Sequence, residues 1–291
     1  MTADQSPYFP SSEDIAAGRQ CLARRGRTVL VKLGGSVITD KRLAFKANDR
    51  AMHRIARELA ARKERLILLN GAGSFGHIPV KRYGLDEGFT ERKRSNFAET
   101  KLQLLRLQEI LISILCGHGL PAVPFIASSF MMARSGKLCR VEMAPLREFL
   151  DLGLVPLFGG DLVPDLDQGW RVVSADQMAS WIAPRIGASM IIYGTDVDGL
   201  YSSDPKICRD ADLIRTVRCR DVRKVARSAL GSRMTDVTAG MRGKLLEAER
   251  AARRGVEVVI MNLTKPEKLH PILDGKRGDW TRIVPEKGRL E

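Results

Sequence analysis

The sequence predicts an α/β protein with a mainly parallel central sheet that is covered by helices on both faces. Short apolar runs, typical of buried strands, recur along the chain from Thr28 onward. Segments with the apolar spacing of amphipathic helices separate most of these runs, and signals for hairpins are scarce. Alternation of strand and helix without hairpins indicates parallel strands joined by crossover helices.

The individual elements follow from these patterns. The predicted strands are Thr28–Lys32, Leu66–Leu69, Ala122–Phe125, Val155–Phe158, Met190–Tyr193 and Val256–Met261. The predicted helices contain Met52, Ile55, Ala56, Leu59 and Ala60 in the first, Leu104, Leu107, Leu111 and Ile114 in the second, and the segments Asp176–Ile186 and Gly240–Arg254. Gly255 is placed as a helix stop, and one hairpin is predicted where Gly136 precedes Lys137–Val141.

The composition limits the kind of protein and its partners. The 291 residues allow one large α/β domain, and we expect a single domain over residues 27–291 behind a partly ordered tail at residues 1–26. The 48 Lys and Arg residues exceed the 34 Asp and Glu residues and give a net charge of +14, which favours anionic partners. Nucleic acids and phosphorylated small molecules are both anionic, so the net charge alone does not distinguish between these two classes of partner.

The cysteines and the hydropathy pattern predict a cytoplasmic location. The five cysteines are odd in number and form no Cys-x-x-Cys pair, which argues against a disulfide framework or a zinc site. The N-terminal segment lacks the apolar core of a signal peptide, and no stretch approaches the roughly 20 apolar residues of a membrane span. A membrane partner is therefore not expected.

Glycine-rich loops follow the first two predicted strands. Gly34, Gly35 and Ser36 follow the first strand, which ends at Lys32, and Lys41 lies nearby. Such a turn lets the backbone approach an anion closely, although glycine pairs also form ordinary turns. The second loop, Asn70–His77, has three glycines, a serine and a histidine within eight residues, which predicts a second anion site.

Three further loops carry acidic or basic residues beside glycines. They are Gly159–Asp161, Gly194–Tyr201 and the segment Thr235–Met241, which leads into a helix that contains Lys244. The acidic residues suit water-bound Mg²⁺ or the orientation of lysines, but they also suit ordinary Asx turns. No Ser-His-Asp or HExxH arrangement is present. The residues fit phosphoryl transfer, in which positioning and charge neutralisation provide most of the catalysis.

These motifs, in this order, resemble those of the amino acid kinase superfamily, and most of all the isopentenyl phosphate kinases. The resemblance extends from about Val29 to Ile283 and is most specific in KLGGSVITDK (Lys32–Lys41), GAGSFGHIPVKRYGL (Gly71–Leu85) and GTDVDGLYSSDP (Gly194–Pro205), with DVTAGMRGKL (Asp236–Leu245) nearly as specific. It implies a three-layer αβα sandwich that binds ATP with Mg²⁺ and transfers a phosphoryl group to a small phosphomonoester. Homodimers are also expected from the resemblance.

The resemblance implies a role for each matching residue. The acceptor-binding half is expected at about 27–170 and the nucleotide-binding half at about 171–291. Lys32 and Lys41 would neutralise charge on the transferring and β/γ phosphates, and Asp161 would orient the lysines. The residues expected to bind ATP are Gly34, Gly35, Ser36, Gly160, Thr195, Asp196 and Lys244. The residues expected to bind the acceptor are Gly71, Ala72, Gly73, Gly160 and His77, and no protein ligand is expected to contact Mg²⁺ directly.

The sequence departs from the family pattern at several positions near the acceptor site. Ala72 replaces a glycine, Gly159 replaces a histidine, and Ala175 and Ala239 each replace a glycine. These changes favour, as an alternative, a kinase of another small phosphate or phosphonate, because the more distantly related fosfomycin kinases retain the same histidine. A pocket for the acceptor's tail is expected from Phe89, Phe97, Leu104 and Ile126, which serve equally well as core.

A nucleic-acid-binding or regulatory role is the third hypothesis. The positive charge and the basic runs at Arg24–Arg27 and Arg92–Arg94 motivate it. The sequence lacks interleaved aromatic and basic residues and any known nucleic-acid-binding motif, so nucleic acid is not the expected partner.

Overall fold

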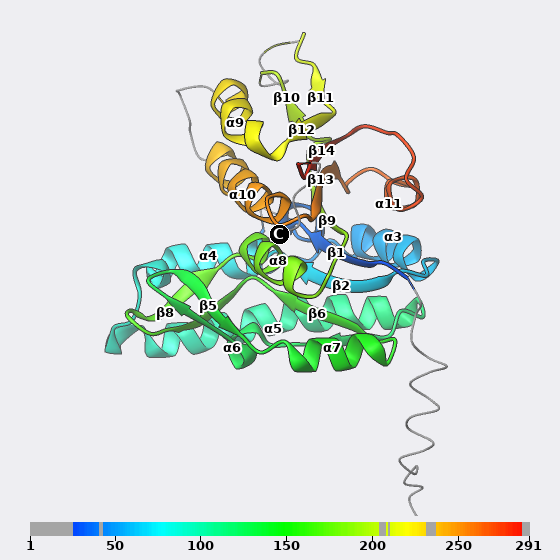
Figure 1. Cartoon of the computed structure of the whole chain (residues 1–291). Coiled ribbons are helices and arrows are strands. Elements are labelled where there is room, and N and C mark those ends of the chain that lie inside the picture. Colours follow the sequence, from blue (N-terminus) through cyan, green and yellow to red (C-terminus); the bar gives the residue numbers. More distant parts are fainter. Residues whose placement is uncertain (1–25, 41–42, 204–207, 209, 231–236, 287–291) are drawn as a thin grey trace, which may run out of the picture.

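An eight-stranded, mainly parallel sheet forms the centre of the protein (Figure 1). The computed structural model describes residues 26–40, 43–203, 208, 210–230 and 237–286. The strand order is β12-β14-β13-β9-β1-β2-β6-β3, and every neighbouring pair is parallel except β13 and β14. The predicted α/β class with a mainly parallel sheet is therefore confirmed.

The strands of the large sheet are β1 (Thr28–Leu33), β2 (Arg65–Asn70), β3 (Ala122–Pro124), β6 (Val155–Gly159), β9 (Met190–Thr195), β12 (Thr216–Arg218), β13 (Glu257–Asn262) and β14 (Trp280–Val284). A four-stranded sheet contains β4 (Met131–Arg134), β5 (Lys137–Val141), β7 (Asp161–Asp165) and β8 (Gly169–Val173), and a two-stranded sheet contains β10 (Leu200–Tyr201) and β11 (Leu213–Ile214). The α-helices are α2 (Gly35–Ile38), α3 (Asp49–Ala60), α4 (Gly73–Tyr83), α5 (Arg94–Gly117), α6 (Ala127–Phe130), α7 (Ala144–Asp151), α8 (Ala175–Arg185), α9 (Val222–Leu230), α10 (Val237–Ala252) and α11 (Leu269–Leu273). Three short 3₁₀ helices occupy Leu85–Glu87, Glu91–Lys93 and Cys219–Asp221.

Two hydrophobic cores lie on opposite faces of the large sheet. Strand β1 contributes to both, because its side chains alternate in direction: Leu30 joins one core, whereas Val29 and Val31 join the other. The first core contains residues from α7, α8, α9 and α10, and the second contains residues from α3, α5 and α11. This arrangement confirms the expected three-layer αβα sandwich.

The small four-stranded sheet contains the predicted hairpin and one that the sequence pattern did not predict. Strands β4 and β5 pair antiparallel around Ser135 and Gly136, whose φ angles are 48° and 75°. Strands β7 and β8 form the second hairpin, and the carboxylate of Asp165 accepts the N–H groups of Asp167 and Gln168 in its turn. The segment Gly159–Asp161, expected as a loop, therefore includes the first residue of β7.

Strands from both halves of the chain meet in the middle of the large sheet. Strand β1 pairs with β2 on one side and with β9 on the other, and β2 pairs with β6. Parallel strands end at the same edge, so the loops after these four strands emerge together. Among the described residues, no helix is long and apolar enough to cross a membrane.

Candidate active site

The glycine loops after β1, β2 and β9 are packed backbone against backbone. A Cβ atom on Gly35 would lie 2.5 Å from the Cα of Gly73, and one on Gly34 would lie 2.5 Å from the carbonyl oxygen of Gly194. Gly73 also has a φ of +51°, a conformation that glycine adopts without strain. These glycines are therefore required by the contact between loops, independently of any ligand.

Close packing corrects the expectation that every glycine N–H in these loops can bind phosphate. The Gly34 N–H donates to the Gly194 carbonyl at 2.9 Å, the Gly71 N–H to Leu33 at 2.8 Å, and the Gly160 N–H to Asn70 at 3.0 Å. Their donors are thus engaged within the protein. Gly35 and Ser36 instead begin helix α2, and the first N–H groups of a helix have no acceptor within it.

A buried carboxylate between two lysines lies beneath these loops. Asp176, in the first turn of α8, is 3.0 Å from the Nζ of Lys32 on β1 and 2.9 Å from the Nζ of Lys244 on α10. Both lysines are at most 8% exposed. Lys244 Nζ also lies 4.8 Å from the centre of the Tyr193 ring, and the Tyr193 hydroxyl donates to the backbone carbonyl of Asp176.

The cluster carries one more positive charge than negative charge. Burial by itself would raise the pKa of Asp176, but the adjacent lysines lower it to about 2. Burial and the charge of Lys32 lower the pKa of Lys244 to about 8, although Asp176 opposes this shift. Two cations that share one carboxylate leave an uncompensated charge in a poorly solvated place, which favours the binding of an anion.

The loop after β9 contributes one exposed side chain and one buried side chain. Asp196 is exposed and accepts a hydrogen bond of 3.0 Å from the hydroxyl of Ser36. Thr195, expected to bind nucleotide, is 5% exposed, and its hydroxyl donates to the carbonyl of Val197 and accepts from the N–H of the same residue. The Thr195 side chain therefore holds the turn that presents Asp196.

His77 lies on the first turns of α4, directly after the second glycine loop, and its side chain is exposed. The preceding residues of this loop are anchored, because the N–H of Ser74 donates to the hydroxyl of Thr39 at 3.1 Å. Gly76 packs against α5, since a Cβ atom there would lie 2.9 Å from Leu104. His77 is thus held by α4, which follows the second glycine loop and packs against α5.

Asp161 was expected to orient the lysines near the first glycine loop, but it contacts a different lysine, Lys101. Its carboxylate lies 2.5 Å from the Nζ of Lys101 on α5, and it also accepts the N–H groups of Ser128 and Leu162. The carboxylate that contacts Lys32 and Lys244 is Asp176. The reason is topological: Asp161 begins β7 beside α5, whereas α8 packs against β1 and α10.

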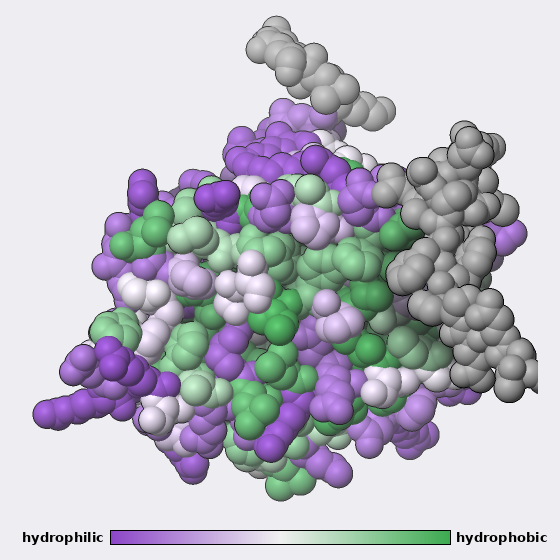
Figure 2. All heavy atoms as spheres, turned by 90° about the horizontal axis from the view of Figure 1, so that it is seen from below, coloured by the Kyte–Doolittle hydropathy of each residue, from purple (hydrophilic) through white to green (hydrophobic). Residues whose placement is uncertain are grey.

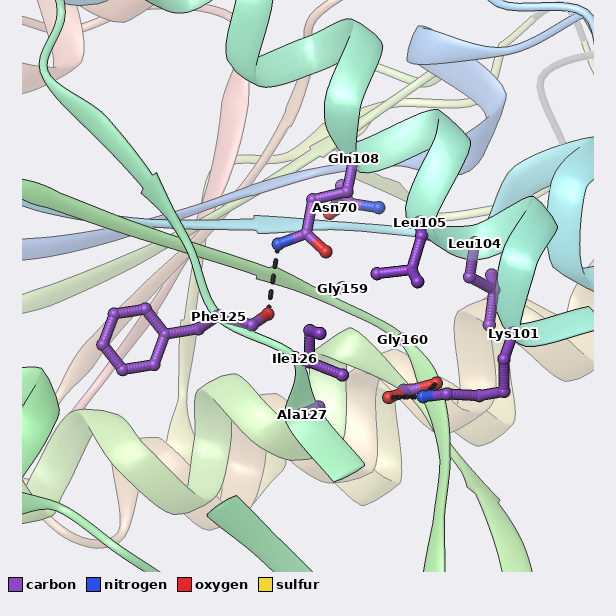
Figure 3. Close-up of a pocket in the computed structure, with 11 residues that line it drawn as sticks. Asn70, Lys101, Leu104, Leu105, Gln108, Phe125, Ile126, Ala127, Gly159 and Gly160 are labelled. Atoms are coloured by element: carbon purple, nitrogen blue, oxygen red, sulfur yellow. Dashed lines mark hydrogen bonds and ion pairs between the residues drawn. The ribbon is translucent and has the colours of Figure 1, made fainter. Parts of the chain in front are cut away.

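A pocket with an apolar wall opens beside Asp161 and Lys101 (Figure 3). Its volume is about 20 Å³, enough for about one water molecule. Helix α5 supplies one wall through four residues at helical spacing, Lys101, Leu104, Leu105 and Gln108. The ends of β2, β3 and β6 supply the others, and Ile126 and Asn70 are among them.

The residues expected to form a tail pocket divide into two groups. Leu104 and Ile126 line the pocket. Phe97 and Phe89 instead pack on Trp170, with ring centres 4.5 Å and 5.1 Å from it. Phe97 packs against a separate small core that contains Leu85 and Leu162, and Phe89 is 45% exposed, so neither residue lines this pocket.

Several site residues were not predicted from the sequence, although one of them was detectable. Asp176 follows Ser174, whose side chain accepts the Gln177 N–H and caps α8, so the motif Ser174-Ala175-Asp176 placed an acid at a helix start. No comparable sequence pattern identified Lys101 or Asn70 as a site residue. Lys41 and Asp236 lie outside the described residues.

The comparisons with known proteins agree on one family. The sequence model described as the amino acid kinase family matches residues 27–262. The isopentenyl phosphate kinase of Methanothermobacter thermautotrophicus is 36% identical over 265 residues, which cover 88% of this chain and 98% of that protein. The isopentenyl phosphate kinase of Methanocaldococcus jannaschii is 30% identical and covers 85% and 95%.

Solved structures of the same kind of protein are similar in fold. An isopentenyl phosphate kinase structure matches with a TM-score of 0.77 and 32% identity, over 88% of this chain and all of that one. A product complex of the Thermoplasma acidophilum isopentenyl phosphate kinase matches with a TM-score of 0.73 and 25% identity, over 88% and 99% of the two chains.

Proposed function

The chain belongs to the amino acid kinase family, and on this basis we propose that it is an ATP-dependent kinase that converts isopentenyl phosphate to isopentenyl diphosphate. The family match covers most of the chain, and the two archaeal relatives described above carry that activity in their names. The half at about 27–170 would bind the acceptor and the half at about 171–291 would bind ATP.

The buried cluster of Lys32, Asp176 and Lys244 is the observation that carries the proposal. Two anionic substrates repel each other, by about 1 kcal/mol per charge pair in water at contact distance and by several times more in a drier site. The surplus positive charge of the cluster, directly beneath the glycine loops, offsets this repulsion. Asp176 contacts both lysines and holds their ammonium groups in place while no substrate is bound.

The reaction needs positioning more than proton transfer. The attacking oxygen belongs to a phosphate that is already ionised near neutral pH, so no general base is required. We propose that Lys32 contacts the transferring phosphoryl group, that Lys244 contacts the nucleotide phosphates, and that the N–H groups of Gly35 and Ser36 face the same phosphates. His77 would hold the phosphate of the acceptor.

Magnesium fits the oxygen-bearing side chains at the mouth of the site. Mg²⁺ prefers carboxylate and hydroxyl oxygens and retains several of its waters, and Asp196 and Ser36 present these groups 3.0 Å apart. When bound with ATP, Mg²⁺ neutralises part of the phosphate charge. Among the described residues, no three His, Cys, Asp or Glu side chains gather in the manner of a metal site.

Steady-state assays test the proposed reaction. Purified protein with Mg²⁺-ATP and isopentenyl phosphate should release ADP in a coupled assay and form isopentenyl diphosphate, identified by mass spectrometry. Absence of ADP release with isopentenyl phosphate, together with turnover of another small phosphate or a phosphonate from a screened panel, would assign the chain to the alternative. The motivation for that alternative is Gly159, where the family commonly has histidine.

The acid–base state of Lys244 predicts a pH dependence of ATP binding. Its pKa is about 8 in the free protein, below the usual lysine value of 10.5, and phosphate charge nearby favours its protonated form. We expect ATP binding just above pH 8 to take up a proton and to weaken as pH rises further, by at most about tenfold per pH unit. Titration calorimetry in two buffers of different ionisation enthalpy measures the uptake.

Lys244→Arg is the control for this prediction. Arginine keeps its charge at all these pH values, so the variant should bind ATP without the proton uptake. Equal uptake in the wild-type protein and in the variant would assign the proton to another group.

A homodimer is proposed from an apolar face. Figure 2 shows hydrophobic side chains gathered on the face formed by α5, α6 and α7 in Figure 1. Leu102, Leu105 and Ile126 on or beside α5 and α6 are 47%, 37% and 38% exposed. Contiguous exposed apolar side chains of this kind mark association surfaces.

Substitution of Leu102 by glutamate should dissociate the dimer. A charge in the centre of an apolar interface is desolvated without a partner, so we expect a change from dimer to monomer at micromolar concentration. Sedimentation velocity measures the mass. Leu166→Glu, at a residue that is 51% exposed on the β7–β8 turn, should leave the dimer intact, and a Leu102→Glu dimer would place the interface elsewhere.

A cytoplasmic location is proposed on chemical grounds. Cys116 and Cys139 are exposed free thiols, a state that persists in a reducing compartment. The proposed substrate ATP is also abundant there.

A further inference from the structure

We infer that the ring of Tyr193 binds the ammonium group of Lys244 and keeps this lysine charged and in place for the nucleotide phosphates. The inference rests on the proposed function, because it concerns a lysine that would contact ATP. Tyr193 lies on β9, and its side chain meets residues of α8 and α10, two helices that pack against each other (Figure 1). It is completely buried, so it would reach neither substrate and would act through Lys244 as a positioning residue.

Tyr193 brings two polar features into the interior of a strand. The residues before it on β9, Met190, Ile191 and Ile192, are apolar, and all of them are buried. An aliphatic side chain would fill the place of Tyr193 without a polar atom, whereas tyrosine brings a hydroxyl group and a ring whose faces are partly negative. Both features have a partner in the fold, and both partners belong to the buried cluster of Lys32, Asp176 and Lys244.

The hydroxyl group fixes the ring against the start of α8. It donates to the backbone carbonyl of Asp176 at 3.1 Å, in the first turn of that helix. A carbonyl oxygen has two lone pairs, so it accepts this bond in addition to a bond within the helix. The orientation of the ring is therefore set relative to the same residue whose carboxylate contacts Lys244.

The face of the ring meets Lys244. The Nζ atom of Lys244 lies over it, 4.8 Å from the ring centre, within the roughly 6 Å over which an aromatic face attracts a cation. Lys244 is only 7% exposed, and this attraction is strongest where both groups have lost their water. The ring is thus a second partner of the ammonium group beside the Asp176 carboxylate, which lies 2.9 Å away and is shared with Lys32.

The charge on Lys244 is maintained against two opposing effects. Burial and the neighbouring charge of Lys32 disfavour the charged form and lower the pKa of Lys244 to about 8, although Asp176 opposes them. A further decrease would leave much of the lysine uncharged near neutral pH and unable to attract phosphate. An attraction between the ring and the ammonium group raises the pKa of Lys244, so its loss should lower that pKa.

Charged side chains that α9, β13 and β14 bring close to α10, and those of the next turn of α10, form ion pairs. The pairs are Arg223–Glu249, Arg282–Glu257 and Arg250–Glu247. The charges that act on Lys244 are those of Lys32 from β1 and Asp176 from α8. The uncharged ring from β9 is therefore the feature to vary, because it can be changed without altering any charge.

Fluorination of the ring tests the inference without a change of shape. Fluorine withdraws electron density from an aromatic face and weakens its attraction for a cation, while the size of the ring hardly changes. The series begins with Tyr193→Phe and continues with phenylalanines that carry one, two and three ring fluorines at position 193. NMR of ¹³C-labelled lysine follows the titration of Lys244 in the protein without substrates, and Lys244→Arg identifies its signal.

We expect the pKa of Lys244 to stay near the wild-type value of about 8 in Tyr193→Phe, which keeps the ring. It should fall with each fluorine and lie about one pH unit lower with three of them. If loss of the hydroxyl group prevents folding, as judged by thermal melting, fluorinated tyrosines at the same position keep that group and carry the test.

The pH profile of the reaction provides a readout that damage to the fold would not produce. A pKa about one unit lower reduces the charged fraction of Lys244 about fivefold at pH 8. The kcat/KM for ATP of the trifluorinated variant should therefore be about fivefold below that of Tyr193→Phe at pH 8, and the two values should converge at about pH 6.5. A deficit that is equal at both pH values would contradict the inference.

The same trifluorinated residue at position 83 is the matched control. The Tyr83 hydroxyl donates to the exposed Glu99 at 3.2 Å, and the residue lies on α4, outside the buried cluster. This exchange should leave the titration of Lys244 unchanged.

The outcomes distinguish the inference from the proposed function. A pKa of Lys244 that does not depend on the number of fluorines, as expected if the ring only fills space, overturns the inference and leaves the kinase assignment. Absence of ATP-dependent turnover of isopentenyl phosphate and of every screened phosphate, with the NMR trend present, overturns the proposed function and the positioning role, but leaves the contact between the ring and Lys244.

Discussion

Replacement of Lys32 by methionine is expected to lower kcat by about 10²–10³-fold, the effect of removing one preorganised charge that stabilises a transition state. The KM for ATP should change much less, because Lys244 remains in place. The fold should also persist, because Lys244 stays 2.9 Å from Asp176 and leaves the carboxylate with a partner. Steady-state kinetics with varied ATP and varied acceptor separates the two parameters.

Two comparisons make the Lys32 result specific. Lys276→Met removes a lysine that is 70% exposed near the end of α11 and should retain wild-type kinetics. Asp176→Asn should instead reduce stability, because it leaves two buried ammonium groups that share no carboxylate. A Lys32→Met enzyme with a kcat close to that of the wild-type protein would remove Lys32 from the chemical step.

Substitution of His77 by alanine is expected to lower kcat/KM for the acceptor by about 10- to 100-fold, the usual effect of one hydrogen bond to a charged group. His77→Gln should also lower acceptor use, because glutamine can donate a hydrogen bond but cannot carry a charge. The apparent affinity for ATP should remain near the wild-type value in both variants, as measured by calorimetry.

His118→Ala is the matched control for His77. His118 lies next to the end of α5, where its Nε2 is 3.0 Å from Nδ1 of His53, and it does not line the pocket. Its removal should leave acceptor kinetics unchanged. Unaltered acceptor kinetics in both His77 variants would contradict the role proposed for that residue.

Local features of the sequence predicted most of the fold. Apolar runs identified all six predicted strands, and Gly255 ends a helix with a φ of +85°. Those features depend on a few neighbouring residues, so they can be recognised from the sequence alone. The hairpin of β7 and β8 was not predicted because its turn depends on Asp165, whose hydrogen bonds to the turn are seen only in the folded chain.

The same distinction applies to the candidate site. The glycine loops, Lys32, His77 and Lys244 were predicted as site residues because they lie at strand ends or in motifs that follow one another in a fixed order. The structural role of each glycine was not recognisable from the sequence, because the contact of Gly35 with Gly73 joins segments that are far apart along the chain. The N–H groups of Gly34 and Gly71 are likewise bound to carbonyls of remote segments, those of Gly194 and Leu33.

The sequence by itself determined the family pattern, the parallel αβα architecture and the set of loops that meet at the sheet edge. Only the tertiary structure decided which acid serves which lysine. Asp176 contacts Lys32 because α8 packs against β1, whereas Asp161 contacts Lys101 because β7 runs beside α5. Charge pairing and pocket shape depend on distances between remote segments, and no local pattern of residues specifies those distances.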